Sequence, residues 1–174
     1  HNINESISNI ANSLIDIYNK DQINIYRTHQ MYYKNSISYL ENQLKLYPNS
    51  GIKLVRGAYL NQDSKYNVLE NNIENTHYNF NTGIEIMSQF KKKQTIIASH
   101  NDDSCLKALD MKDIDFFDYA QLLGMNDSLS KKIQDEGGDV YKYIPYGPLN
   151  LCVPYLLRRL YENLDTLKYL NLFK

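Results

Sequence analysis

Apolar side chains follow two different periods along the chain, and segments of the two kinds alternate. Six segments carry apolar residues every three or four positions, which predicts amphipathic helices. Between them lie five short segments rich in β-branched and aromatic residues, which are typical of strands. We therefore expect helices over residues 3–19, 34–47, 77–91, 102–111, 126–136 and 149–163. Strands are expected over residues 23–32, 52–60, 95–99, 115–123 and 139–144.

Turn and capping residues separate these segments. Pro48-Asn49-Ser50-Gly51 predicts a turn, and Gly124 closes the strand that precedes it. Either Asp102 or Asp103 is expected to cap the helix over 102–111. The polar, Asn-rich stretch 61–76 is expected to be a loop.

One helix followed by five strand–helix pairs predicts an α/β fold with parallel strands and right-handed crossovers. A closed (βα)8 barrel of the TIM type has eight such units and about 250 residues, whereas this chain has 174 residues. Two architectures fit: an open α/β sheet, or a barrel whose first three strands lie upstream. The short strands favour the barrel, with residues 1–174 as part of one domain.

Composition argues against several classes of partner. The formal net charge is -1, and Lys91-Lys92-Lys93 is the single compact basic run, so we expect no nucleic-acid surface. Cys105 and Cys152 lack metal-ligand spacing, and no metal site is expected. No apolar stretch reaches the roughly 18 residues of a membrane span. The first residues lack a targeting pattern, and we interpret them as the start of an internal segment.

Polar and aromatic side chains stand at the predicted carboxyl ends of the strands, where parallel α/β folds bind their ligands. They are Gln30, residues 56–59, His100-Asn101, residues 121–125 and Tyr143. The set contains neither the acid pair of a glycosidase nor a Ser-His-Asp series with a nucleophile elbow. We therefore expect these residues to hold a cofactor that carries the chemistry itself.

Each of the three main candidates at the strand ends also has a plainer interpretation. Gly57 permits close backbone approach to a ligand, or it simply ends a strand. Arg56 faces a phosphate or an electron-rich ring, or it is a surface or ion-paired arginine. His100 donates to a cofactor oxygen, or it is a hydrogen-bonded histidine at a strand end.

The last predicted helix carries Arg158 and Arg159, with Glu162 three and four positions further on. At this spacing Glu162 can pair with either arginine. Two guanidinium groups beside one pocket form a clamp for a carboxylate, and a solvated Arg–Glu face is the alternative. A carboxylate clamp next to a cofactor pocket would form a site for an amino acid.

A series of motifs resembles the proline dehydrogenase family. The motifs are KLVRGAYL at 53–60, ASHN at 98–101, QLLGM at 121–125, VYKYIPYG at 140–147 and YLLRRLYEN at 155–163. They follow one another in the order of the family's strands and final helix. The sequence of the first motif is similar to that of the eukaryotic, mitochondrial branch of the family.

The resemblance implies a distorted (βα)8 barrel, of which this chain holds strands 4–8 as the C-terminal portion of one domain. It also implies a flavoenzyme in which FAD oxidises L-proline to 1-pyrroline-5-carboxylate and the electrons pass to a quinone. A mitochondrial location, with possible peripheral association with the inner membrane, follows from the same resemblance.

The resemblance further implies roles for individual residues. Those expected to hold the flavin are Gln30, Lys53, Arg56, Gly57, Ala58, Ser99 and His100. Those expected to contact the substrate are Leu54, Tyr59, Tyr143, Arg158, Arg159 and Glu162. Arg158 and Arg159 would grip the proline carboxylate with support from Glu162. Tyr143 would pack on the substrate ring, where its bulk disfavours 4-hydroxyproline.

Two hypotheses compete with a working flavoenzyme. The first is a half-barrel without catalysis that acts as a binding or residual module. The second is an open-sheet α/β protein that binds another carboxylate and no flavin. Binding of FAD would exclude the open-sheet protein that binds another carboxylate. Turnover of proline would exclude the half-barrel without catalysis.

Overall fold

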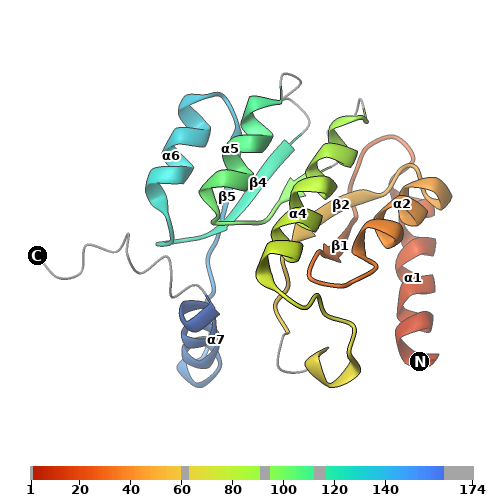
Figure 1. Ribbon diagram of the computed structural model, residues 1–174, viewed down its shortest axis with the longest axis horizontal. Helices are drawn as coiled ribbons and strands as arrows, with labels where there is room; N and C mark the ends of the chain where they lie inside the picture. Colours follow the sequence, from red (N-terminus) through yellow and green to blue (C-terminus); the bar gives the residue numbers. More distant parts are fainter. Residues whose placement is uncertain (1, 60–62, 91–94, 112–116, 163–174) are drawn as a thin grey trace, which may run out of the picture.

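The computed structural model describes residues 2–59, 63–90, 95–111 and 117–162, with side chains from residue 7 to residue 159 within these ranges. The order of strands and helices is the alternation that the apolar periods predict (Figure 1). The elements are α1 Asn2–Tyr18, β1 Tyr26–Gln30, α2 Ser36–Leu46, β2 Gly51–Val55, the 3-10 helix η1 Ser64–Tyr66, α4 Ile73–Ser88, β3 Thr95–Ile97, α5 Asp102–Asp110, β4 Phe117–Leu122, α6 Asp127–Asp135, β5 Asp139–Tyr143 and α7 Leu149–Glu162.

The five strands form one parallel sheet in the order β1-β2-β3-β4-β5. Each strand pairs with the next along the chain, so that Lys53 of β2 lies between Thr28 of β1 and Ile96 of β3. A doubly wound open sheet reverses its strand order at a switch point, whereas a TIM-type barrel adds its strands in sequence. The order observed here is that of consecutive units of a (βα)8 barrel, which confirms the predicted fold class.

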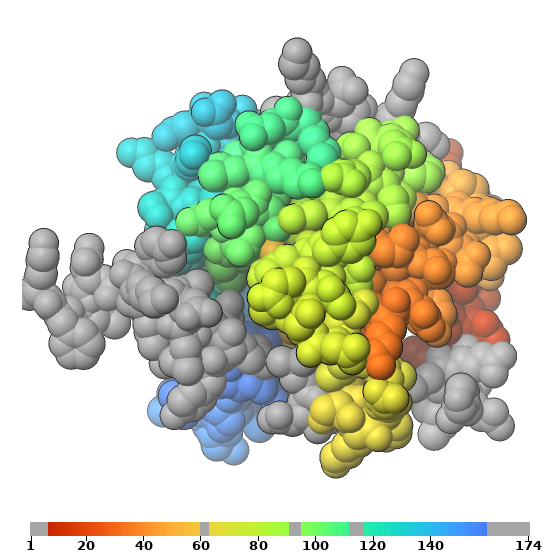
Figure 2. Space-filling model, viewed as in Figure 1, coloured from red at the N-terminus to blue at the C-terminus, as the bar shows by residue number. Residues whose placement is uncertain are grey.

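The hydrophobic core lies between one face of the sheet and the helices that follow the strands. Figures 1 and 2 show α2, α4, α5 and α6 side by side as a continuous layer in front of the sheet. Strand side chains alternate between the two faces, and Ile52 and Leu54 of β2 point into this core with Phe80 and Ile84 of α4. Lys53 and Val55 flank Leu54 along β2, and their side chains therefore face the opposite side of the sheet.

The start of α4 and the capping residue of α5 differ from the sequence predictions. Helix α4 begins at Ile73, one turn earlier than expected, because the Asn72 side chain accepts a hydrogen bond from the backbone N–H of Asn75. The stretch 61–76 is therefore not a loop throughout its described part. The cap of α5 is Asn101, whose side chain accepts from Ser104 N, and not Asp102 or Asp103 as predicted.

Helix α1 lies at the β1 edge and is amphipathic as predicted, but few of its apolar residues are buried. Ile15 is buried, whereas Ile7, Ile10 and Ile17 are exposed. Polar contacts hold the helix against β1, since Arg27 donates to Ser8 and Asn12.

None of the described helices combines the length and the apolar character needed to cross a membrane.

The connection between α1 and β1 depends on one buried side chain, Asn19. Its amide group donates to the carbonyls of Ile25 and Asn49, and its oxygen accepts from the backbone N–H groups of Asn24 and Ile25. This side chain therefore satisfies three backbone groups in the turn before β1 and one, the Asn49 carbonyl, in the turn before β2.

We expect Asn19→Ala to lower the free energy of unfolding by about 1–3 kcal/mol, because buried backbone groups lose their partners. Denaturant unfolding followed by circular dichroism measures the change. Gln22→Ala is the matched control, since it removes only an exposed hydrogen bond to Asn24. Equal effects of the two substitutions would contradict the role assigned to Asn19.

Candidate functional site

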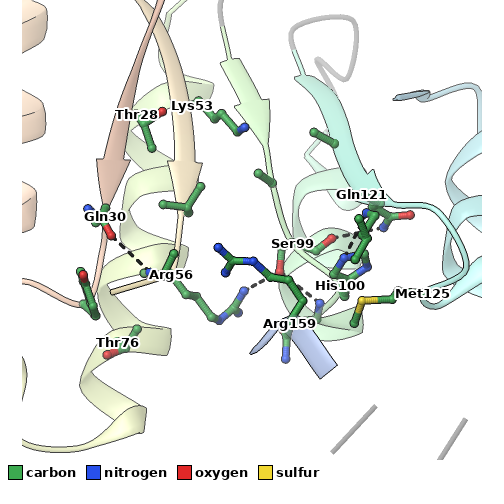
Figure 3. Close-up of a pocket in the computed structure, with 18 of the residues that line it drawn as sticks. Thr28, Gln30, Lys53, Arg56, Thr76, Ser99, His100, Gln121, Met125 and Arg159 are labelled. Carbon is green, nitrogen blue, oxygen red and sulfur yellow. Dashed lines mark hydrogen bonds between the residues drawn. The ribbon is translucent and has the colours of Figure 1, made fainter. Parts of the chain in front are cut away.

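The carboxyl ends of the five strands open onto one pocket of about 1040 Å³. Each strand or the turn that follows it contributes to the wall, and α4 and α7 add side chains from either side (Figure 3). Figure 1 shows η1 and α7 at this same end of the sheet. The pocket is therefore at the place where parallel α/β folds bind ligands.

Most of the residues predicted from the sequence come together in this pocket. Those that line it are Gln30, Lys53, Arg56, Gly57, Ala58, Tyr59, Ser99, His100, Tyr143 and Arg159. Arg158 is exposed and is not among the lining residues. The backbone of Glu162 ends α7, but its side chain lies outside the described part of the chain.

The prediction that Leu54 lines the substrate pocket is wrong. Its side chain is fully buried in the core between β2 and α4. Lys53 and Val55, its neighbours along the strand, line the pocket instead. The reason is the two-residue period of a strand, which sends adjacent side chains to opposite faces.

Gly57 forms a close contact that requires the absence of a side chain. Its φ angle is 149°, and a Cβ atom there would come within 2.3 Å of the Tyr32 ring. The next residue, Ala58, donates its backbone N–H to Oε1 of Gln30 at 3.3 Å. Gly57 is thus more than a strand terminator, and the group that approaches it in this structure is the Tyr32 ring.

Arg56 holds a positive charge in the wall of the pocket. Its guanidinium donates to His77 Nδ1 at 3.1 Å, Ser99 Oγ at 2.5 Å and Ser104 Oγ at 2.7 Å. Its Cζ atom lies 4.3 Å from the centre of the Phe80 ring. Burial lowers the pKa of Arg56 to about 10, so the group stays cationic near neutral pH. No described carboxylate forms a salt bridge with it, and its charge can act on a ligand.

His100 presents a buried donor without a partner. Its Nε2 atom accepts the backbone N–H of Leu122 at 3.2 Å. The proton of the neutral ring therefore lies on Nδ1, a buried atom that has no hydrogen-bond partner among the described residues. Burial, and next the charge of Lys142, lower the pKa of His100 to about 4. The ring is thus neutral at pH 7 and offers one N–H to a ligand acceptor.

Helix α7 adds an aromatic and cationic group at the β5 side of the pocket. The Tyr143 and Tyr155 rings meet edge to face with centroids 6.0 Å apart. The Arg159 Cζ atom lies 5.3 Å from the centre of the Tyr155 ring. Figure 3 shows the Arg159 side chain reaching back towards the ends of β2 and β3. A guanidinium packed on one ring of a tyrosine pair suits a small ligand that has a carboxylate and an apolar body.

Sequence reasoning missed some of the lining residues. Tyr155 lies four positions before Arg159, and this spacing on a helix could have placed both side chains on one face. Thr76 and His77 line the pocket from α4, in a stretch where the sequence predicted a loop or only the start of a helix. The partner of Gly57, Tyr32, gives no local signal because their contact spans two strands.

Comparison with known proteins identifies relatives. A family model described as proline dehydrogenase matches residues 3–171. The chain is 34% identical to proline dehydrogenase 1, mitochondrial, of Dictyostelium discoideum, over 84% of this chain and 30% of the relative. It is 29% identical to a hydroxyproline dehydrogenase of Xenopus laevis, over 95% of this chain and 41% of the relative. The chain thus spans about a third of the length of these relatives.

Solved structures share the fold. Proline utilization A of Bdellovibrio bacteriovorus, in a form inactivated by N-propargylglycine, superposes with a TM-score of 0.70 at 22% identity. The match covers 86% of this chain and 18% of that protein. At this identity the likeness supports the barrel-type order of strands and helices.

Two partly buried histidines make the stability of the fold sensitive to acid. Burial lowers the pKa of both His29 and His100 to about 4, whereas a histidine in an unfolded chain titrates near 6.5. As the pH falls from about 6.5 to about 4, the unfolded chain takes up these two protons before the folded protein does. The free energy of unfolding therefore decreases over this window, and neither histidine affects it further outside the window.

Denaturant unfolding at pH 7 and at pH 5 measures this loss. Replacing His29 or His100 by Gln should reduce the difference between the two pH values, because one titrating group is removed. Histidine signals that titrate with midpoints near 6.5 in NMR spectra would contradict the low pKa of these groups.

Proposed function

Because the chain belongs to the proline dehydrogenase family, we propose that it carries the cofactor- and substrate-facing part of a proline dehydrogenase site. In the proposed reaction FAD oxidises L-proline to 1-pyrroline-5-carboxylate, and the electrons pass on to a quinone. The observation that carries the proposal is the convergence on one pocket of a cationic Arg56, an unpartnered His100 N–H and Arg159.

The wall formed by β1, β2 and β3 has a donor set that fits a flavin. A flavin ring system is rich in acceptor atoms, and the buried Nδ1–H of His100 has no partner in the described protein. The Arg56 charge supplies a fixed positive potential in the same wall. We propose that Gln30, Lys53, Arg56, Gly57, Ala58, Ser99 and His100 hold the cofactor. FAD, when bound, supplies the redox chemistry by accepting two electrons.

The opposite side of the pocket has the chemistry to bind proline. Arg159 provides a fork of donors for the substrate carboxylate, and Tyr143 provides a flat surface for the apolar ring. Tyr59 completes the wall on the β2 side. Arg158 and Glu162 remain in the proposal as the second guanidinium and its support. Gripping the carboxylate fixes the orientation of the substrate, which lowers the entropic part of the barrier.

How complete the site is depends on which part of a barrel the chain represents. We propose that the five βα units correspond to strands 4–8 of a (βα)8 barrel, within one domain. The order β1-β2-β3-β4-β5 supports this correspondence, as does the match to about a third of each relative. The competing proposal is a half-barrel that binds ligands without catalysis.

The location of the protein and its electron acceptor are part of the same proposal. A mitochondrial location is supported by the name of the Dictyostelium relative. Quinone reduction and peripheral association with the inner membrane would follow from membership in the mitochondrial branch.

The test is the visible absorption spectrum of the purified chain mixed with FAD, before and after anaerobic addition of L-proline. A second sample is a chimera in which the N-terminal part of the Dictyostelium relative precedes this chain. We expect both proteins to bind flavin and the chimera to lose its flavin absorption on addition of proline. Trans-4-hydroxy-L-proline should act more weakly because of the bulk of Tyr143. A chimera that binds FAD but stays oxidised with proline would support the half-barrel without catalysis.

Substitutions of the two adjacent arginines in the chimera test the carboxylate site, through the rate of flavin reduction at increasing proline concentrations. We expect Arg159→Ala to raise the proline KM about tenfold or more while the flavin stays bound, because a charge-assisted contact is lost. Arg158→Ala should have a smaller effect, since Arg158 is exposed and outside the pocket lining. Loss of flavin in Arg159→Ala, with an unchanged KM in the remaining holoprotein, would contradict the substrate role.

A further inference from the structure

Two tyrosines and one aspartate form a cluster at the edge of the pocket, and Tyr32 of this cluster lines it. The proposed reaction assigns no role to these three residues. Tyr32 and Tyr33 follow β1, and both phenol groups donate to the same carboxylate oxygen, Oδ2 of Asp63. The Tyr33 contact is 2.7 Å long, and the two ring centroids are 4.6 Å apart. We call these three residues the tyrosine–carboxylate clamp.

The clamp joins two segments that are distant in sequence. One is the turn after β1, and the other follows β2 and comprises residues 57–59 and 63–70, here called the pocket segment. Backbone hydrogen bonds run from Tyr32 N to Arg56 O at 2.8 Å and from Glu70 N to Tyr32 O at 2.8 Å. Tyr33 also forms an isolated antiparallel bridge with Leu69. The pocket segment is thus held at both of its ends.

The clamp acts on residues that line the pocket. The Tyr32 ring is buried and lies where a Cβ atom of Gly57 would be. The backbone N–H of Asp63 donates to the carbonyl of Tyr59 at 3.0 Å. The position of Asp63 therefore determines the position of Tyr59 directly and that of Gly57 through the Tyr32 ring.

Both phenols are well suited to this role. Burial, and then the hydrogen bond to Asp63, raise the pKa of Tyr32 and of Tyr33. The two groups are therefore neutral donors at any physiological pH. Two donors on one carboxylate oxygen leave that oxygen little freedom to move, since each hydrogen bond to a charged group is stronger than a neutral one.

We propose that Asp63 is a positioning residue, which through Tyr32 and Tyr33 fixes the Gly57–Tyr59 wall, in which Gly57 and Ala58 receive the cofactor. The proposal rests on the proposed function for the identity of the cofactor, but the ordering of the wall is a property of the protein alone. The substrate contacts of Arg159 are independent of it.

The experiment has a cofactor-free arm and a cofactor arm. In the first, hydrogen exchange follows the Ala58 amide, which donates to Gln30, with the Ala98 amide in the sheet as an internal reference. In the second, fluorescence titration gives the Kd for FAD at a temperature well below unfolding. The variants are Asp63→Ala and Tyr33→Phe. Glu85→Ala, which breaks the exposed pair with Lys107, is the matched control.

We expect Asp63→Ala to speed exchange at Ala58 but not at Ala98, and to raise the Kd for FAD about tenfold or more, since two hydrogen bonds to a charged group are lost. Tyr33→Phe keeps the ring and one donor and should give an intermediate value, and Glu85→Ala should change neither quantity.

A lower melting temperature for Asp63→Ala with an unchanged Kd would overturn the proposal, because it would reduce the clamp to a structural tie. Unchanged exchange at Ala58 would overturn it as well. If the unaltered protein bound no FAD, the proposed function would fail, and the exchange arm alone would then decide whether Asp63 fixes the wall.

Discussion

The alternation of side chains along β2 is the constraint on which the rest of the structure depends. Leu54 points into the core against α4, while Lys53 and Val55 face the pocket. A shift of one residue in register would bury Lys53 and expose Leu54. The apolar packing of one face therefore fixes which polar groups reach the other. The turn at Gly57 then places Arg56 and Ala58 in the pocket wall.

The electrostatics of the pocket follow from this geometry. The hydrogen-bond partners of Arg56 are neutral and the group keeps its charge, while His100 is kept neutral by burial and by the charge of Lys142. The two residues thus present a cation and a neutral donor from adjacent strands, while Arg159 supplies a second cation from α7. Such fixed groups can orient a cofactor and an anionic substrate without reorganising during the reaction.

Much of this could be predicted from the sequence, because the apolar periods and the strand-end positions are local signals. Gln30, Arg56 and His100 were found in this way. The family motif alone places Leu54 in the pocket, whereas the two-residue period of the strand turns its side chain into the core. The cap of α5 was assigned to the wrong residue because three neighbouring residues, Asn101 to Asp103, can all act as caps. The contact of Tyr32 and Tyr33 with Asp63 spans about thirty positions and depends on strand pairing, so no local pattern could predict it.

The central claim is that the unpartnered N–H of His100 and the charge of Arg56 form a flavin-binding wall. The most direct measurement is the NMR signal of the His100 Nδ1–H during titration with FAD. We expect this proton signal to shift in a saturable way while the ring stays neutral, and Arg56→Met to weaken the response. A His100 signal that does not change while FAD binds would contradict the claim, because the cofactor would then lie elsewhere on the protein.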